Sequence, residues 1–289
     1  MDRVIRLSAA AALLVVALGA GAARAAGDEP AAVALQPLRA THLWEGAGVL
    51  TADAGRFTSA RAGLLAANRF RWVAIQLANG LASNRHNVAA LQRGWAEGFR
   101  ARGIRVCGWG ANGRRPVREA ALVARFVTRY RLDCYIADAE TPYMGGDYGG
   151  DPRRSAAFVA AFRKRLPTLP AALTTMGGAT GPWVYPFDYT SWRRRGFALL
   201  PQAYLSISTA YCPSCTVDHA ARAGYPRARV HPMVGVGWSQ DRGKRSGAEY
   251  AWRLARAGTV GFSVFLGETS SDADFRALGA AIRSRRIAR

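Results

Sequence analysis

Acidic residues and lysine are scarce in this sequence. Its 289 residues include 19 Asp and Glu against 40 Lys and Arg, which gives a formal net charge of +21 at pH 7. Lys164 and Lys244 are the only lysines, so arginine carries nearly all of the positive charge. With so few carboxylates, one that falls within an apolar segment needs a reason, because a buried charge costs stability unless it is paired.

Long hydrophobic runs are absent after the N-terminus, so we expect no membrane span in the main part of the chain. At the N-terminus, Arg3 and Arg6 precede an uncharged stretch over 7–21, and Ala23-Arg24-Ala25 has the small-x-small pattern of a cleavage site. We predict that residues 1–25 are a secretory signal peptide. The alternative is an uncleaved anchor, but a run of about 15 residues is shorter than the roughly 20 needed to cross a bilayer.

The predicted export of this strongly cationic chain affects which binding partners we expect for it. The arginines are spread over predicted helix faces without the motif of a nucleic-acid-binding module, so we expect no nucleic-acid partner. A secreted or extracytoplasmic protein of this charge is attracted electrostatically to anionic cell-wall polymers or membrane surfaces, and added salt weakens this attraction. Codon composition of the source genome explains the arginine content equally well. We expect a wall-associated monomer with no stable membrane insertion after signal cleavage.

Several catalytic and nucleotide-binding motifs are also missing. There is no G-x-S-x-G or H-E-x-x-H, and the four histidines are scattered. Residues 108–113 match G-x-G-x-x-G, but Arg114-Arg115-Pro116 separates this loop from the next helix, which argues against a dinucleotide site. Residues 237–244 miss the P-loop spacing by one position. We expect no cofactor and no bound metal.

Only four cysteines are present. In an exported protein an even number permits disulfides. Cys212 and Cys215, with His219, would supply only three zinc ligands, so we predict a disulfide between these two cysteines. Cys107 and Cys134 fall in successive predicted strands and are either bridged or simply buried.

What the chain does contain is a repeat of about thirty residues. From about residue 40, short apolar β-type segments alternate with amphipathic helical segments, at centre-to-centre spacings of about 30 to 37 residues. The expected strands are 41–45 and segments centred near Ala74, Val106, Ile136, Leu173, Ala203, Met233 and Val264. The expected helices are 57–68, 88–102, 117–131, 153–166, 189–196, 217–223, 247–257 and 271–284.

Eight strands that alternate with helices predict parallel pairing, and eight such units close a barrel. The predicted fold is therefore α/β, a single-domain (β/α)8 or TIM barrel over 40–289, joined to the signal peptide by a linker over 26–39. An open doubly wound sheet is the alternative that the spacing leaves open.

Asp138 and Glu140 lie at the end of the fourth predicted strand. Residues i and i+2 of a strand point to the same face, about 6.6 Å apart. Two close, partly desolvated carboxylates do not both ionise easily, so one keeps a proton. A protonated acid beside a carboxylate is what glycoside cleavage requires. The alternatives are a structural ion pair with an arginine or a pair of metal ligands.

The run from Asp133 to Glu140 resembles the D-x-x-D-x-D-x-E signature of the family-eighteen chitinases, with Ile136 in place of the second Asp. It is also similar to the D-x-E strand of the family-twenty-five lysozymes, and residues 199–204 resemble the sixth chitinase strand. Both are families of exported TIM-barrel enzymes that act on polymers of N-acetylated sugars. The resemblance implies that Glu140 is the general acid, that Asp138 orients the N-acetyl group or stabilises charge, and that Tyr204 hydrogen-bonds that group.

Polar and aromatic side chains at the predicted strand ends and in the loops after them are candidates for substrate binding, because flat rings with a polar edge stack on sugars. For any one ring, ordinary core packing is an equal alternative. These candidates are Trp44, Glu45, Gln76, Trp109, Tyr143, Trp183, Gln202, Trp238 and Glu268.

Two functional hypotheses remain. In the first, the protein is an exported glycoside hydrolase that acts on a polysaccharide of the peptidoglycan or chitin type. In the second, it is a noncatalytic carbohydrate-binding or wall-binding barrel.

Overall fold

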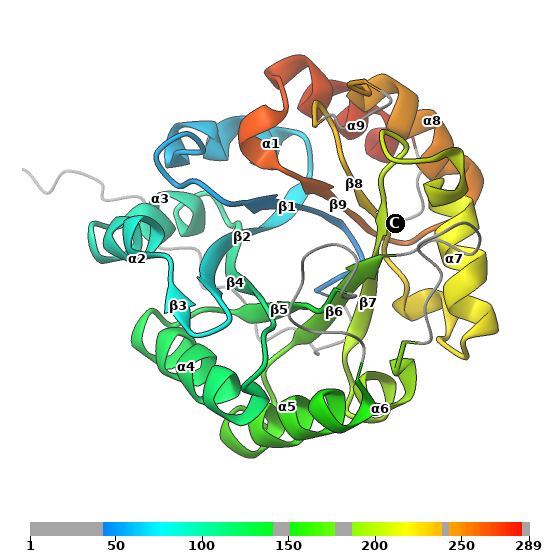
Figure 1. The fold of residues 1–289 in the computed structure, drawn as a ribbon. Helices are drawn as coiled ribbons and strands as arrows, with labels where there is room; N and C mark the ends of the chain where they lie inside the picture. Colours follow the sequence, from blue (N-terminus) through cyan, green and yellow to red (C-terminus); the bar gives the residue numbers. More distant parts are fainter. Residues whose placement is uncertain (1–42, 141–150, 177–186, 239–242, 285–289) are drawn as a thin grey trace, which may run out of the picture. The chain divides into compact units, whose positions relative to one another are not determined.

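Eight apolar segments form the parallel strands of a closed barrel (Figure 1). The computed structural model describes residues 43–140, 151–176, 187–238 and 243–284, so the predicted signal peptide and linker lie outside the described residues. Each barrel strand pairs with the next, and β1 pairs with both β2 and β9, which closes the ring. The strands of the barrel are β1 (Ala47–Thr51), β2 (Phe70–Asn79), β4 (Arg105–Ala111), β5 (Cys134–Asp138), β6 (Ala171–Met176), β7 (Ala198–Ala203), β8 (Met233–Val234) and β9 (Phe262–Phe265).

This closure confirms the predicted (β/α)8 barrel and excludes the open sheet. A short strand, β3 (Ala82–Ser83), pairs antiparallel with the end of β2 outside the regular ring. None of the helices in the described part of the chain is both long and apolar enough to cross a membrane.

The helices surround the ring of strands (Figure 1). The segment predicted as one helix over 88–102 is two helices, because Gly94 between them adopts a left-handed conformation with φ of +88°. The predicted helix over 247–257 is present with the same bounds, and the other predicted helices are present with shifted ends. The helices are α1 (Ala62–Ala67), α2 (Arg85–Gln92), α3 (Trp95–Arg100), α4 (Pro116–Arg129), α5 (Pro152–Arg165), α6 (Tyr189–Arg194), α7 (Pro213–Arg222), α8 (Gly247–Ala257) and α9 (Asp272–Arg283).

The first strand lies later in the chain than predicted. The expected strand over 41–45 is wrong, and β1 begins at Ala47. All five residues of β1 are buried, as expected of a parallel strand covered on both faces. Trp44 and Glu45 therefore precede the strand, at the amino-terminal end of the barrel. Trp44 is 2% exposed, and its ring packs edge-on against Trp72 at a centroid distance of 5.2 Å.

Side chains alternate between the inside of the barrel and the layer under the helices, as the two-residue period of strands requires. The inner set fills the barrel with Leu50, Trp72, Ala74, Cys107, Trp109, Cys134, Ile136, Leu200 and Met233. Cys107 and Cys134 are paired in the β4–β5 register and form a disulfide, with 4.5 Å between their Cα atoms. Of the two possibilities left open for these cysteines, bridging is therefore correct.

Gly48 is a sensitive point of this inner packing, because a Cβ there would lie 2.0 Å from the Trp72 ring on the neighbouring strand. We predict that Gly48→Ala lowers the free energy of unfolding by about 3 kcal/mol or more, through overpacking. Gly63→Ala is the matched control, since nothing lies within 4 Å of the added Cβ in α1. That change should be neutral or stabilising by up to about 1 kcal/mol. Urea unfolding measures both, and equal midpoints for the two variants would contradict the packing argument.

Candidate active site

Asp138 and Glu140 come together with Gln202 at the carboxyl end of the barrel. Asp138 is the last residue of β5, and its spacing from Cys134 and Ile136 places its side chain on the inner face. Nε2 of Gln202, on β7, donates to Glu140 Oε1 at 2.9 Å and to Asp138 Oδ1 at 3.3 Å. A single side-chain amide thus forms hydrogen bonds with both carboxylates.

Both carboxyl groups are partly buried, and this desolvation raises the pKa of each. The negative charge of Glu140 raises the pKa of Asp138 further, whereas the hydrogen bond from Gln202 lowers that of Glu140 and partly offsets its burial. Because the two titrations are linked, the proton belongs to the pair. The pair therefore holds a proton at a pH where free carboxyl groups are ionised.

Tyr204 places a phenol beside this pair. It directly follows β7 and is 3% exposed, and burial together with the two carboxylates raises its pKa, so its hydroxyl stays protonated. Among the described residues this hydroxyl has no hydrogen-bond partner. A buried donor without a partner is costly, and a bound molecule with an acceptor at this position would satisfy it.

An aromatic cluster continues from Tyr204 along the same end of the barrel. The centroid of the Tyr204 ring lies 4.8 Å from that of Trp238 and 5.6 Å from that of Phe265. Phe265 also lies 6.1 Å from Trp109, whose Nε1 donates to the carbonyl of Thr51 at 2.8 Å. The predicted residues Trp109 and Trp238 are therefore brought to one cluster with Tyr204.

Like Trp109 and Gln202, two further predicted substrate-binding residues form hydrogen bonds within the protein. Glu268 follows β9, and its carboxylate accepts hydrogen bonds from Thr51 Oγ1 at 2.8 Å and from the Ala52 amide at 3.0 Å. Oε1 of Gln76 accepts a hydrogen bond from Asn84 at 3.2 Å. Glu268 thereby ties the loop after the last strand to the end of the first.

Trp44 and Glu45 do not join the site. The prediction placed them at the carboxyl end of the first strand, but they precede β1 and lie at the opposite end of the barrel. Tyr143 and Trp183 lie outside the described residues. Asp133, the first acid of the chitinase-like run, also lies at the far end of β5, where it accepts a hydrogen bond from the Val106 amide and lies 3.5 Å from the guanidinium of Arg105.

Sequence reasoning missed Phe265, Thr51 and Thr174. Thr174 is aligned with Asp138 in the β5–β6 register, and its buried hydroxyl has no partner in the described parts of the chain. Inner-face parity could have indicated Phe265, which lies two residues after Ser263 on β9. Thr51 was missed because the first strand was placed too early.

No group of three or more His, Cys, Asp or Glu side chains within residues 43–140, 151–176, 187–238 and 243–284 could hold a metal ion. The chemistry that the described side chains offer is proton transfer by the carboxylate pair, hydrogen bonding by the phenol and amide, and stacking by the rings.

No protein-family model and no curated protein matches this sequence. Solved structures do match it. The catalytic domain of a hyperthermophilic chitinase from Pyrococcus furiosus is 7% identical, with a TM-score of 0.61 over 83% of this chain and 96% of that one. A class V chitinase from Pseudomonas fluorescens Pf-5 is 10% identical, with a TM-score of 0.56 over 82% and 99%.

A third match is the endo-β-N-acetylglucosaminidase of Cordyceps militaris, at 13% identity and a TM-score of 0.51 over 82% of this chain and 90% of that one. It was solved as a variant with Asp→Asn and Glu→Gln changes two positions apart, in complex with fucosyl-N-acetylglucosamine-Asn. At these identities the likeness establishes the fold. The expected resemblance to chitinase barrels is confirmed at that level.

The raised pKa of Asp138 has a consequence for stability. The folded state binds the proton of the Asp138 carboxyl group more tightly than the unfolded chain does. The stabilisation of the folded state that results is fully present below the unfolded pKa and is lost as pH rises through the folded pKa. We predict that Asp138→Asn raises the free energy of unfolding by about 1 kcal/mol at pH 7 and changes it little at pH 4. Urea unfolding at the two pH values measures this difference.

Asp133→Asn is the control at the other end of the same strand. It weakens contacts with the Val106 amide and with Arg105, so stability at pH 7 should fall by about 1 kcal/mol. A loss of stability at pH 7 for both variants would show that Asp138 is a structural partner and not a destabilised functional acid.

Proposed function

We propose that this protein is a glycoside hydrolase that cleaves a polysaccharide containing N-acetylated sugars, of the chitin or peptidoglycan type. The observation that carries the proposal is the partly buried Asp138–Glu140 pair, bridged by Gln202 at the end of the fourth barrel strand. Chitinases share the fold. The Cordyceps enzyme variant carries its Asp and Glu changes at the same two-residue spacing as this pair, which supports the comparison.

In the proposed reaction the pair starts with one proton. An N-acetyl group whose N–H donates to Asp138 stabilises that residue as the carboxylate, so the proton is held by Glu140. Glu140 then protonates the glycosidic oxygen, which leaves with the electrons of the bond to C1. The acetyl oxygen attacks C1 as that bond breaks, and the Tyr204 hydroxyl donates to this group.

The second step returns the pair to its starting state. Glu140, now a carboxylate, takes a proton from a water molecule that attacks C1 and displaces the acetyl oxygen. Gln202 keeps the two carboxyl groups in place throughout, because its amide contacts both. The ring of Trp238, which packs against Tyr204, offers a surface on which a neighbouring sugar stacks.

The test is release of reducing ends from chitin and from peptidoglycan by the mature protein. We expect Glu140→Gln to lower kcat by about 100-fold or more on the polymer that the wild type cleaves, because the amide cannot donate the proton. Glu97→Gln is the matched control, since this exposed carboxylate on α3 pairs only with Arg100 among the contacts described. The control should keep wild-type activity.

The noncatalytic hypothesis gives the opposite result in the same assay. Wild-type protein that sediments with the polymer but releases no reducing ends would overturn the hydrolase and leave a carbohydrate-binding barrel.

We also propose that the protein is exported and lies on anionic cell-wall polymers. The N-terminal sequence supports the proposal of export. A groove of about 880 Å³ on α4 and α5 supports the proposal that the protein binds an anionic polymer. Its lining contains no acid and consists of Arg118, Arg125, Arg129 and Arg165 with the small residues Ala121, Ala124 and Thr128. All four arginines are exposed, so a linear polyanion could contact several guanidinium groups at once.

Cell fractionation tests both parts of this proposal. We expect the wild type in the wall fraction, starting at Ala26 by mass spectrometry and released by about 1 M salt, which screens exposed charges. Arg118→Glu with Arg125→Glu should move the protein to the medium. The control, Arg102→Glu with Arg276→Glu, changes net charge equally outside the groove and should stay on the wall. Equal release of both variants would contradict a role for the groove, and an intact N-terminus would contradict signal cleavage.

A further inference from the structure

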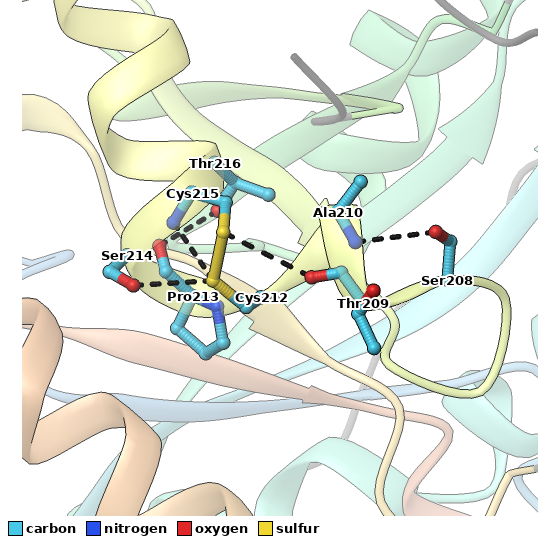
Figure 2. Close-up of a disulfide and its surroundings, with 8 residues drawn as sticks. All are labelled: Ser208, Thr209, Ala210, Cys212, Pro213, Ser214, Cys215 and Thr216. Carbon is cyan, nitrogen blue, oxygen red and sulfur yellow. Dashed lines mark hydrogen bonds between the residues drawn. A yellow bond between two sulfur atoms is a disulfide. The ribbon is translucent and has the colours of Figure 1, made fainter. Parts of the chain in front are cut away.

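The Cys212–Cys215 disulfide, which the sequence predicted, lies at the start of a helix (Figure 2). Helix α7 begins at Pro213, and Cys212 is its N-cap residue. Sγ of Cys212 accepts a hydrogen bond from the Cys215 amide at 3.2 Å and lies 3.2 Å from Ser214 Oγ. Since a disulfide sulfur carries no proton, the serine hydroxyl is the donor in that contact. Two donors of the first turn therefore point at one sulfur.

The two sulfurs differ in their surroundings. Cys212 lies at the positive end of a ten-residue helix that has no acidic side chain in its first turn. Cys215 Sγ has the carbonyl of Thr209 at 4.0 Å instead, an acceptor that favours a protonated thiol (Figure 2). After reduction, negative charge is therefore stabilised on Cys212 and disfavoured on Cys215.

The other disulfide of the chain provides a contrast. Cys107 and Cys134 are both 0% exposed inside the barrel, whereas Cys212 and Cys215 are partly exposed on the helical layer. A reductant in solution reaches the second pair without any opening of the barrel. The two bridges should thus differ sharply in their rates of thiol exchange.

From this geometry we infer that Cys212–Cys215 is an exchangeable disulfide whose partner is an external dithiol. A thiolate of the dithiol attacks Cys215 Sγ, the Cys212–Cys215 bond breaks, and Cys212 leaves as a thiolate held by the Cys215 amide and the Ser214 hydroxyl. The second thiolate of the partner then attacks its own sulfur in the mixed disulfide, and Cys215 leaves and takes up a proton. Two electrons pass to the protein, and the dithiol becomes a disulfide.

The first test uses the unmodified mature protein under native conditions. Brief treatment with dithiothreitol, followed by iodoacetamide and mass spectrometry, should label Cys212 and Cys215 while Cys107–Cys134 stays intact until denaturant is added. No labelling without denaturant would overturn the inference. Labelling of all four cysteines on one time course would overturn it as well, because it would show that reduction requires opening of the whole barrel.

The second test addresses the asymmetry. Cys215→Ser leaves Cys212 as a single thiol at the N-cap, and Cys212→Ser leaves Cys215 with a serine that still caps the helix. At pH 7, Cys212 should react with iodoacetamide at least about tenfold faster than Cys215, and at least about tenfold faster than Cys212 in a synthetic peptide of residues 209–218 that carries the same Cys215→Ser change. Equal rates for Cys212 in the protein and in the peptide would show that the helix does not stabilise the thiolate. The inference is independent of the proposed hydrolase activity.

Discussion

The hydrogen bonds from Gln202 are the interaction on which the candidate site depends. Two partly buried carboxylates at close range repel each other and lose hydration, so they remain together only where a donor and a shared proton compensate. The Gln202 amide contacts both and comes from β7, two strands away from β5 in the barrel. Tyr204, which directly follows the same strand, lies beside the pair. The site thus joins two separate strands and requires the curved sheet that brings their ends together.

Closure of the barrel provides that curvature, and β1 is the strand that closes it. Its end is held from two directions: Glu268, after β9, binds the Thr51 hydroxyl and the Ala52 amide, and Trp109, on β4, donates to the Thr51 carbonyl. Below these contacts, Trp72 and the Cys107–Cys134 disulfide fill the interior. A filled interior leaves the carboxyl end as the part of the barrel where a ligand can meet inner-face side chains.

Most of the barrel strands could be located from the pattern of hydrophobic residues in the sequence. The predicted centres of seven strands, from the one near Ala74 onward, all lie within observed strands, because parallel strands are short buried segments at a regular spacing. The first strand could not be placed in this way, since both 41–45, with Leu43 and Trp44, and Ala47–Thr51, with Val49 and Leu50, contain adjacent large hydrophobic residues, and pairing with β2 and β9 identifies the second segment as the strand. Because the first strand was predicted too early in the chain, Trp44 and Glu45 were wrongly assigned to the site and Thr51 was not recognised as part of it.

The carboxylate pair could be predicted because Asp138 and Glu140 are only two residues apart in the sequence. The hydrogen bonds by which Gln202 bridges them could not be predicted. Gln202 was selected as a strand-end residue, and nothing in the sequence indicates that its amide reaches both acids across β6. The same limit explains the two disulfides. The pairing of Cys212 with Cys215 follows from proximity in the chain, whereas Cys107 and Cys134 are 27 residues apart and are bridged only because the β4–β5 register aligns them. Contacts between strands depend on register, and register is a property of the closed barrel that no single segment of the sequence encodes.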